Sequence, residues 1–379
     1  MLRSRRVVGD RRWRVIKFGD TVVRRLSISI PARINIVGSP TDAVEGAYAT
    51  ISAAIDLRGG ARIRAANGLE FCRATGETAS FPRQRIADAR GFDIEAAAVN
   101  ALLRYVPDFA PRLRERGAAI STWTDIPASS GLAGSSVLLL AVLGVLRAFY
   151  GLDQRRCNDY VLAEIAQRAE EQEMGIVCGF ADRYVPLFGG IAYLGYHGKL
   201  WHAPVGEEPF ATYEPLGRCA PHLRFCIATT GVQRNSGSAH APMRARYLDE
   251  RRRGSGPLLQ LARQLGETAW RGKIALLAGD LKEFGAQITR NHELIDTMMH
   301  TCGFANGAGT EVRALIAAAH DAGALGAKLT GAGAIFALPA NGQEEALAEA
   351  LRVAAQRAGL TCSEVFVVPV SETGWKVEA

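Results

Sequence analysis

The sequence predicts an α+β protein of two domains. Its 379 residues exceed the usual length of a single domain and provide enough apolar side chains for a sizeable core. Strand-like and helix-like segments both occur, but they lack the regular strand–helix alternation that is typical of a parallel sheet. Residues 204–221 are rich in Pro, Gly and Glu, and this segment is the expected linker.

In the first half, an alternating apolar pattern starts at Leu26 and leads into a glycine turn, as expected of a strand. The long apolar helix expected at 137–150 follows two serines, and we expect Ser135 or Ser136 to cap it and Gly151 to close it. Segments 94–103 and 158–173 have helical periodicity, and 61–65 and 119–124 have a strand pattern. Segment 47–55 is small and apolar.

In the second half, glycines at 331 and 333 interrupt an apolar segment, which predicts a strand, a turn and a second strand over 327–338. A further strand is expected at 223–229. Helical periodicity marks the remaining segments, which are 258–283 (one or two helices), 312–322 and 344–358.

The net charge of +7 is concentrated at one end of the chain. Residues 1–25 contain nine Lys or Arg and two Asp, whereas residues 26–379 contain equal numbers of bases and acids. The body is therefore neutral, and the composition does not indicate a nucleic-acid partner for it. Any polyanion affinity is expected to belong to the basic extension, residues 1–25.

The remaining bulk features predict a cytoplasmic protein without a membrane partner. Seven cysteines form no C-x-x-C pair, which is typical of a reducing compartment and argues against a zinc site. Charged residues interrupt the region where a signal peptide would need its apolar core. The uncharged run 126–146 contains Pro127 and several Ser and Gly residues, and its continuous apolar part is too short to cross a bilayer.

Three glycine- and serine-rich turns are candidate ligand sites, at 38–42, 131–136 and 328–333. The middle turn connects a strand to a long helix, so free backbone N–H groups and the positive end of the helix dipole would face an anion. An ordinary capped helix is the alternative for this turn, and a tight hairpin is the alternative for the third. Neither the P-loop pattern nor the dinucleotide fingerprint is present.

Two carboxylates between these turns suit phosphoryl transfer. Glu170 comes late in a predicted helix and could hold Mg²⁺, and Asp182 follows two glycines and could accept a hydroxyl proton. The alternative for Glu170 is a solvated helix end, and the alternative for Asp182 is a surface ion pair with Arg183.

Together, the turns resemble the three ordered motifs of the GHMP kinases. The first motif is similar to residues 31–38 (PARINIVG), the second to 127–136 (PASSGLAGSS) and the third to 328–333 (KLTGAG). The resemblance covers about residues 26–340. It implies a two-domain fold: a ribosomal-protein-like N-terminal domain at 26–205 that binds ATP, and a ferredoxin-like C-terminal domain at 206–379.

The same resemblance implies roles for individual residues. Asp182 would be the catalytic base or orient the acceptor, with Arg33 beside it. Ser136 and Glu170 would hold Mg²⁺. The ATP phosphates would lie against the second and third motifs, at Gly131, Leu132, Ala133, Gly134, Ser135, Ser136, Gly331 and Gly333.

The expected reaction is transfer of the ATP γ-phosphate to the anomeric hydroxyl of a sugar or uronic acid. Asp42 lies where sugar-phosphorylating members carry a hydroxyl-binding aspartate, and this region resembles the glucuronokinase-like group. A uronate carboxylate would need a bidentate partner, for which Arg183, Arg234 and Arg244 are candidates. Surface positions are the alternative for each arginine.

Other functions stay open at this point. Residues 291–294 and 323–330 resemble the C-terminal half of mevalonate kinases, so a mevalonate or cyclitol acceptor is an alternative. A catalytically silent ligand sensor of the same fold is another, and nucleic-acid binding by the basic extension is a third. The sequence leaves a homodimer open.

Overall fold

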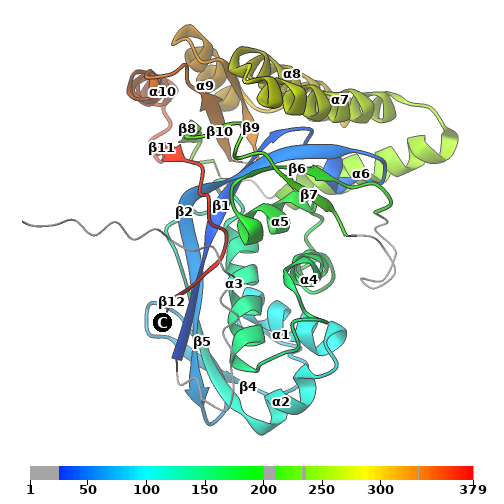
Figure 1. Cartoon of the computed structure of the whole chain (residues 1–379), viewed down its shortest axis with the longest axis vertical. Helices are drawn as coiled ribbons and strands as arrows, with labels where there is room; N and C mark the ends of the chain where they lie inside the picture. Colours follow the sequence, from blue (N-terminus) through cyan, green and yellow to red (C-terminus); the bar gives the residue numbers. More distant parts are fainter. Residues whose placement is uncertain (1–24, 200–209, 233–235, 332, 379) are drawn as a thin grey trace, which may run out of the picture.

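Two antiparallel-rich sheets, each with its own helices, organise the chain (Figure 1). The computed structural model describes residues 25–199, 210–232, 236–331 and 333–378, with the backbone alone at 236–239. In the first sheet the strand order is β12-β1-β2-β5-β3-β4, β6 pairs with β2, and β7 pairs with β6. Its strands are β1 (Arg25–Val37), β2 (Ala49–Ala66), β3 (Leu69–Cys72), β4 (Thr78–Phe81), β5 (Gly117–Thr124), β6 (Ile191–Gly195), β7 (Thr212–Pro215) and β12 (Lys376–Glu378).

The second sheet has the order β11-β8-β10-β9, and its neighbours are all antiparallel. These strands are β8 (Arg224–Thr229), β9 (Gly326–Thr330), β10 (Ala334–Leu338) and β11 (Val365–Pro369). The expected strand–turn–strand over 327–338 is thus β9 and β10.

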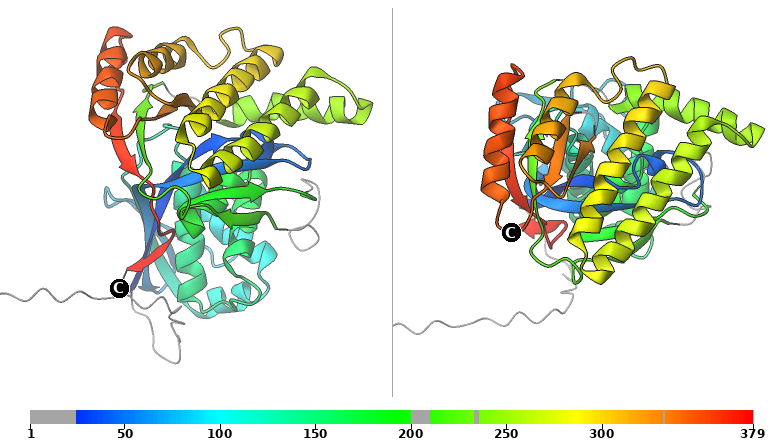
Figure 2. Two further views of the ribbon diagram at one scale, coloured as in Figure 1. Left: turned by 45° about the horizontal axis from the view of Figure 1, so that its top comes forward. Right: turned by 90° about the horizontal axis from the view of Figure 1, so that it is seen from above.

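The helices divide between the two sheets. One group lies against a single face of the first sheet (Figure 1): α1 (Asp93–Tyr105), α2 (Phe109–Glu115), α3 (Gly134–Phe149), α4 (Asp159–Gln172) and α5 (Ala181–Phe188). The other group belongs to the second domain (Figure 2): α6 (Ser236–Arg253), α7 (Pro257–Ala278), α8 (Leu281–Thr301), α9 (Thr310–Asp321) and α10 (Glu344–Arg357). Of these, α8, α9 and α10 pack on the second sheet, whereas α7 packs on α8 and also contacts β2. The expected α+β class is confirmed.

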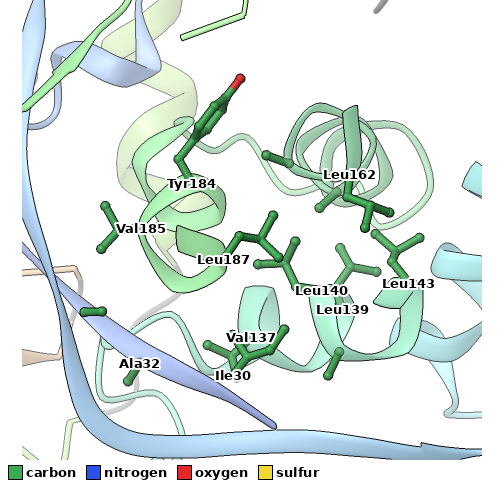
Figure 3. Close-up of a cluster of buried hydrophobic side chains, with 14 of the residues drawn as sticks. Ile30, Ala32, Val137, Leu139, Leu140, Leu143, Leu162, Tyr184, Val185 and Leu187 are labelled. Carbon is green, nitrogen blue, oxygen red and sulfur yellow. The ribbon is translucent and has the colours of Figure 1, made fainter. Parts of the chain in front are cut away.

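The core of the first domain centres on α3. Its apolar side chains contact β1, α4 and α5, and Figure 3 shows Val137 and Leu140 between Ile30 of β1 and Leu187 of α5. The uncharged run at 126–146 is therefore largely a buried helix. No described helix is long and apolar enough to span a bilayer.

Three details differ from the sequence-based expectations. Neither Ser135 nor Ser136 caps α3, because the helix starts at Gly134 and its N-cap is Ala133, which has a left-handed backbone (φ 68°). The apolar segments at 47–55 and 61–65 are parts of one long strand, β2. β8 starts the second sheet after the expected linker. However, β7 and β12 pair with strands of the first sheet, although both follow the expected domain boundary at 205/206.

Candidate active site

A cavity of about 1210 Å³ lies between the two domains. One wall comes from the first domain, chiefly the turn after β1, the segment 124–136 before and within α3, and the start of α5. The opposite wall comes from α6, α8, β9 and the loop after α8. Most of the predicted site residues line this cavity: Arg33, Asp42, Gly131, Ala133, Gly134, Ser135, Ser136, Glu170, Asp182 and Gly331.

The N-terminus of α3 forms an anion site at the cavity wall. Left-handed backbone at Gly131 (φ 74°) and Ala133 (φ 68°) turns the chain into the helix. No side chain caps the helix N-terminus. Its first N–H groups, at Gly134, Ser135 and Ser136, therefore stay available to a ligand, and the helix dipole favours a negative charge there.

The third glycine turn, around Gly331 and Gly333, packs directly against the loop at 129–136 that leads into α3, here called the phosphate loop. A Cβ on Gly331 would lie 2.2 Å from the carbonyl oxygen of Gly131, and one on Gly333 would lie 2.2 Å from that of Ser129. Both glycines are therefore required by a close approach of two backbones. Gly333 and Leu132 do not line the cavity but support it, since Leu132 is buried and its carbonyl accepts a hydrogen bond from the Arg33 backbone N–H.

Ser136 and Glu170 form a buried pair beneath the loop. The Ser136 hydroxyl donates to Glu170 Oε1 at 2.7 Å, and Arg183 makes an ion pair with Glu170 Oε2. No group of three His, Cys, Asp or Glu side chains among the described residues is placed to hold a metal. One hydroxyl and one carboxylate suit Mg²⁺, which usually takes one or two protein oxygens and completes its shell with water and substrate phosphates.

Asp182 is held by two side chains from β1. Arg33 donates from Nε to Oδ1 and from Nη2 to Oδ2, both at 2.6 Å, and Asn35 donates to Oδ1 at 3.2 Å. Burial alone would raise the pKa of Asp182, but the Arg33 charge and these hydrogen bonds hold it below its usual value. Arg33 also donates to the Gly131 carbonyl at 2.7 Å and so connects Asp182 to the phosphate loop.

Asp42 is a second carboxylate at the same end of the cavity. Its Oδ2 accepts the Ala181 backbone N–H at 3.1 Å. Burial raises the pKa of this carboxyl, and the charge of Asp182 adds to that effect. A Cβ on Gly179 would lie 2.0 Å from Asp42 Oδ2, so the missing side chain at 179 makes room for the carboxylate.

The arginines proposed for a substrate carboxylate are engaged elsewhere. Arg183 is fully buried, pairs with Glu170 and donates to the Gly179 carbonyl at 2.5 Å. Arg244 donates to the Ala43 carbonyl, to Glu171 and to the Cys178 carbonyl, at 2.6–2.8 Å. Neither lines the cavity, and Arg234 lies outside the described residues.

Several cavity features were missed in the sequence. Asn35 lies within the first motif, but only the structure shows that it bonds Asp182. His240 lines the cavity, and burial lowers its pKa to about 4, so the imidazole is neutral at physiological pH. Apolar side chains of the second domain cover the opposite wall: Met243, Ile295, Met298, Met299, Phe304 and Leu329. Leu329 lies in the third motif, but the others are scattered and form no pattern that a sequence motif would show.

Comparison with known proteins places this geometry in a family. The model described as "GHMP kinases N terminal domain" matches residues 95–190, and "GHMP kinases C terminal" matches residues 273–359. Glucuronokinase 1 of Arabidopsis thaliana is 27% identical over 267 residues, which is 68% of this chain and 67% of that protein. Mevalonate kinase of Thermococcus sibiricus is 27% identical over 375 residues, which is 93% of this chain and 98% of that protein.

A solved structure supports the fold. Galactokinase of Lactococcus lactis, complexed with galactose, superposes with a TM-score of 0.70 at 18% identity and covers 94% of this chain and 95% of its own. The N-terminal match contains the second motif, at 127–136, and the C-terminal match contains the third, at 328–333. The chain therefore belongs to the GHMP kinase family, whose members are phosphotransferases.

Proposed function

We propose that this protein transfers the γ-phosphate of ATP to the anomeric hydroxyl of a sugar. The observation that carries the proposal is the Arg33–Asp182 pair, because it joins an acceptor carboxylate to the phosphate loop through the Gly131 carbonyl. Phosphoryl transfer needs mainly positioning and neutralisation of charge; this pair supplies positioning, and the anion site next to it would supply neutralisation.

Asp182 is suited to orient the attacking hydroxyl. Arg33 and Asn35 together use both lone pairs of Oδ1 and one of Oδ2, which leaves one lone pair of Oδ2 for the hydroxyl proton of the acceptor. As the acceptor oxygen bonds to the γ-phosphorus, its proton passes to Asp182 Oδ2, the bond from that phosphorus to the β-phosphate bridging oxygen breaks, and ADP leaves. The low pKa of Asp182 keeps it ionised for this role.

The phosphate end is assigned to the remaining motif residues. The N–H groups at the start of α3 would bind ATP phosphates, with Gly331 and Gly333 supporting the loop. Ser136 and Glu170 would hold Mg²⁺. Bound there, the ion would neutralise charge on the transferred phosphoryl group.

The acceptor end favours an uncharged sugar over a uronate. Asp42 accepts a hydrogen bond from the Ala181 backbone N–H, and its carboxylate would accept further bonds from acceptor hydroxyl groups. Arg183 and Arg244, by contrast, already bond protein oxygens. The mevalonate kinase relative, which matches 93% of this chain, supports mevalonate as the second candidate.

A screen of ADP release tests the proposal, with MgATP and a panel of free sugars, uronic acids, cyclitols and mevalonate. We expect turnover of at least one free sugar. Turnover of mevalonate alone would replace the sugar with the second candidate. Sugar binding in calorimetry with no ADP formed under any condition would instead indicate a silent sensor.

Substitution of Ser136 tests the phosphate end. Ser136→Ala removes one buried hydroxyl and should lower kcat by about 100-fold or more, the usual effect of losing one placed polar group from such a site. Ser29→Ala is the matched control, because the Ser29 hydroxyl is also buried and hydrogen-bonded but does not line the cavity. Equal kcat values for the two variants would contradict the assignment of Ser136.

The proposal extends to the compartment. All seven cysteines are free thiols, which agrees with a reducing cytoplasm. Formation of a homodimer and the role of the basic extension stay predictions.

A further inference from the structure

Lys328 of β9 is a fully buried cation that the proposed mechanism does not use. Its Nζ donates to the Asn35 carbonyl oxygen at 3.1 Å, to Ser39 Oγ at 2.9 Å and to Asn291 Oδ1 at 3.1 Å. An ammonium group has three hydrogens, so these three acceptors satisfy it completely.

The three acceptors belong to both domains. Asn35 and Ser39 come from β1 and the turn after it, whereas Asn291 belongs to α8. Asn291 also donates from Nδ2 to the Ser39 carbonyl at 3.1 Å, which closes a ring of hydrogen bonds around the turn. The ammonium thus joins β9 and α8 of the second domain to the turn at 38–42 of the first.

This turn carries the acceptor end of the cavity. Ser39, Pro40 and Asp42 line the cavity, and Asn35 donates to Asp182. We propose that Lys328 is a positioning residue for the acceptor, whose ammonium fixes the turn at 38–42 and Asn35 so that Asp42 and Asp182 face the same acceptor molecule. The inference rests on the proposed function, because it takes these two carboxylates as the acceptor site.

The charge of Lys328 makes this role dependent on pH. Burial lowers the pKa of Lys328 to about 7; the charge of Asp42 opposes this shift and that of Arg33 adds to it. His292 on α8 also lies near the ammonium, but it is neutral because burial, helped by Lys328, lowers its pKa to about 4. A neutral amine has only two N–H donors for three acceptors, so the ring loses one hydrogen bond as the pH rises through 7.

The test compares Lys328→Met with Lys282→Met, an exposed lysine of α8 that serves as the control. With the sugar that turns over fastest in the ADP-release panel, we expect Lys328→Met to raise the acceptor KM by about ten-fold or more, the usual effect of leaving buried polar groups unpaired. The KM for ATP should stay within about two-fold of wild type. An unchanged acceptor KM, or an equal rise in both KM values, would overturn the inference.

The pH profile separates positioning from mere support of the fold. In the wild type the acceptor KM should rise as the pH increases from 6 to 8.5, and in Lys328→Met this rise should be absent. A variant that keeps the wild-type rise would show that another group titrates. If Lys328→Met does not fold, Asn291→Leu is the second variant, because Asn291 is the one of the three acceptors of Lys328 that does not line the cavity. It should raise the KM for the sugar several-fold without changing the KM for ATP.

A stability measurement tests the buried ammonium without any acceptor. The pKa of Lys328 is lowered on folding, so between pH 7 and 10 this side chain binds more protons in the unfolded chain, and its contribution to the free energy of unfolding should rise with pH. Buried thiols with a raised pKa, such as Cys157, act in the opposite sense in both proteins, so the rise should appear in urea titrations as a growing difference in the free energy of unfolding between wild type and Lys328→Met. Failure to bind ATP or phosphorylate any acceptor would reject the proposed function. The absence of this pH-dependent rise would instead reject the claim that Lys328 titrates as a buried ammonium.

Discussion

Asp182 and Asp159 offer a matched comparison of two carboxylates that each pair with a buried arginine. Arg33 pairs with Asp182 and Arg147 with Asp159, and in both pairs about a fifth of the aspartate side chain is exposed. Because only Asp182 lies in the cavity, Asp182→Asn should lower kcat by about 100-fold or more, whereas Asp159→Asn should leave kcat near wild type.

Thermal unfolding and steady-state kinetics of both variants check this expectation. Similar losses of stability, combined with a loss of kcat in Asp182→Asn alone, would assign Asp182 to catalysis. Near-normal turnover of Asp182→Asn would show that the motif assignment is wrong.

The two carboxylates of the acceptor end should titrate on opposite sides of the ordinary range. Burial and the Asp182 charge raise the pKa of Asp42, while Arg33 keeps that of Asp182 low. As the pH falls, Asp42 is therefore protonated first and loses its ability to accept hydrogen bonds from acceptor hydroxyls. We expect kcat/KM for the acceptor to fall in mild acid in wild type, with this inflection absent in Asp42→Asn. An inflection that persists in Asp42→Asn would assign it to another group.

At the level of elements, the contact between the second and third glycine turns explains why both motifs are needed. Gly331 has φ 55° and lies against the Gly131 backbone, so Gly331→Ala would both strain the turn and push the phosphate loop away. Gly342 (φ 77°) is the matched control, since a Cβ there would meet no atom within 4 Å.

Both alanine variants should lose about 1 kcal/mol of stability from the left-handed backbone, but only Gly331→Ala should also raise the KM for ATP. Equal KM values for ATP in the two variants would show that this contact does not shape the phosphate site.

The elements also show how far the sequence could be interpreted. Long periodic segments such as α3, α9 and α10 were predicted within a few residues. Three-residue β12 and four-residue β7 were missed, because such short strands depend on pairing with β1 and β6 rather than on a pattern of their own. In the site, the motif resemblance was enough to predict that Arg33 lies beside Asp182. The hydrogen bond between Lys328 and Asn291 could not be predicted in this way, because no motif that the sequence showed includes Asn291 as the partner of Lys328.

For the whole molecule, the segment after β11 attaches the second domain to the first. The Gly374 carbonyl accepts a hydrogen bond from Arg58 at 2.8 Å, Trp375 stacks with Arg147, and β12 pairs with β1. A chain ending at residue 370 should therefore melt at least about 5 °C below the full chain, as expected for a loss of a few kcal/mol.

Differential scanning calorimetry checks this expectation. The control is Val377→Ser in the full chain, which keeps the backbone pairing of β12 and removes only an exposed apolar side chain. An unchanged midpoint in the truncated chain would show that the segment contributes little to stability.

The pairing of β12 with β1 has a consequence for synthesis on the ribosome. Among the described strands, β1 is made first and β12 last, so the edge of β1 at residues 27–29 keeps its backbone groups unpaired until β12 emerges. The first domain can collapse early, but its sheet cannot be completed until translation has passed β12. A nascent chain stalled before residue 376 should consequently expose this strand edge to chaperones, and release of the finished chain should protect it.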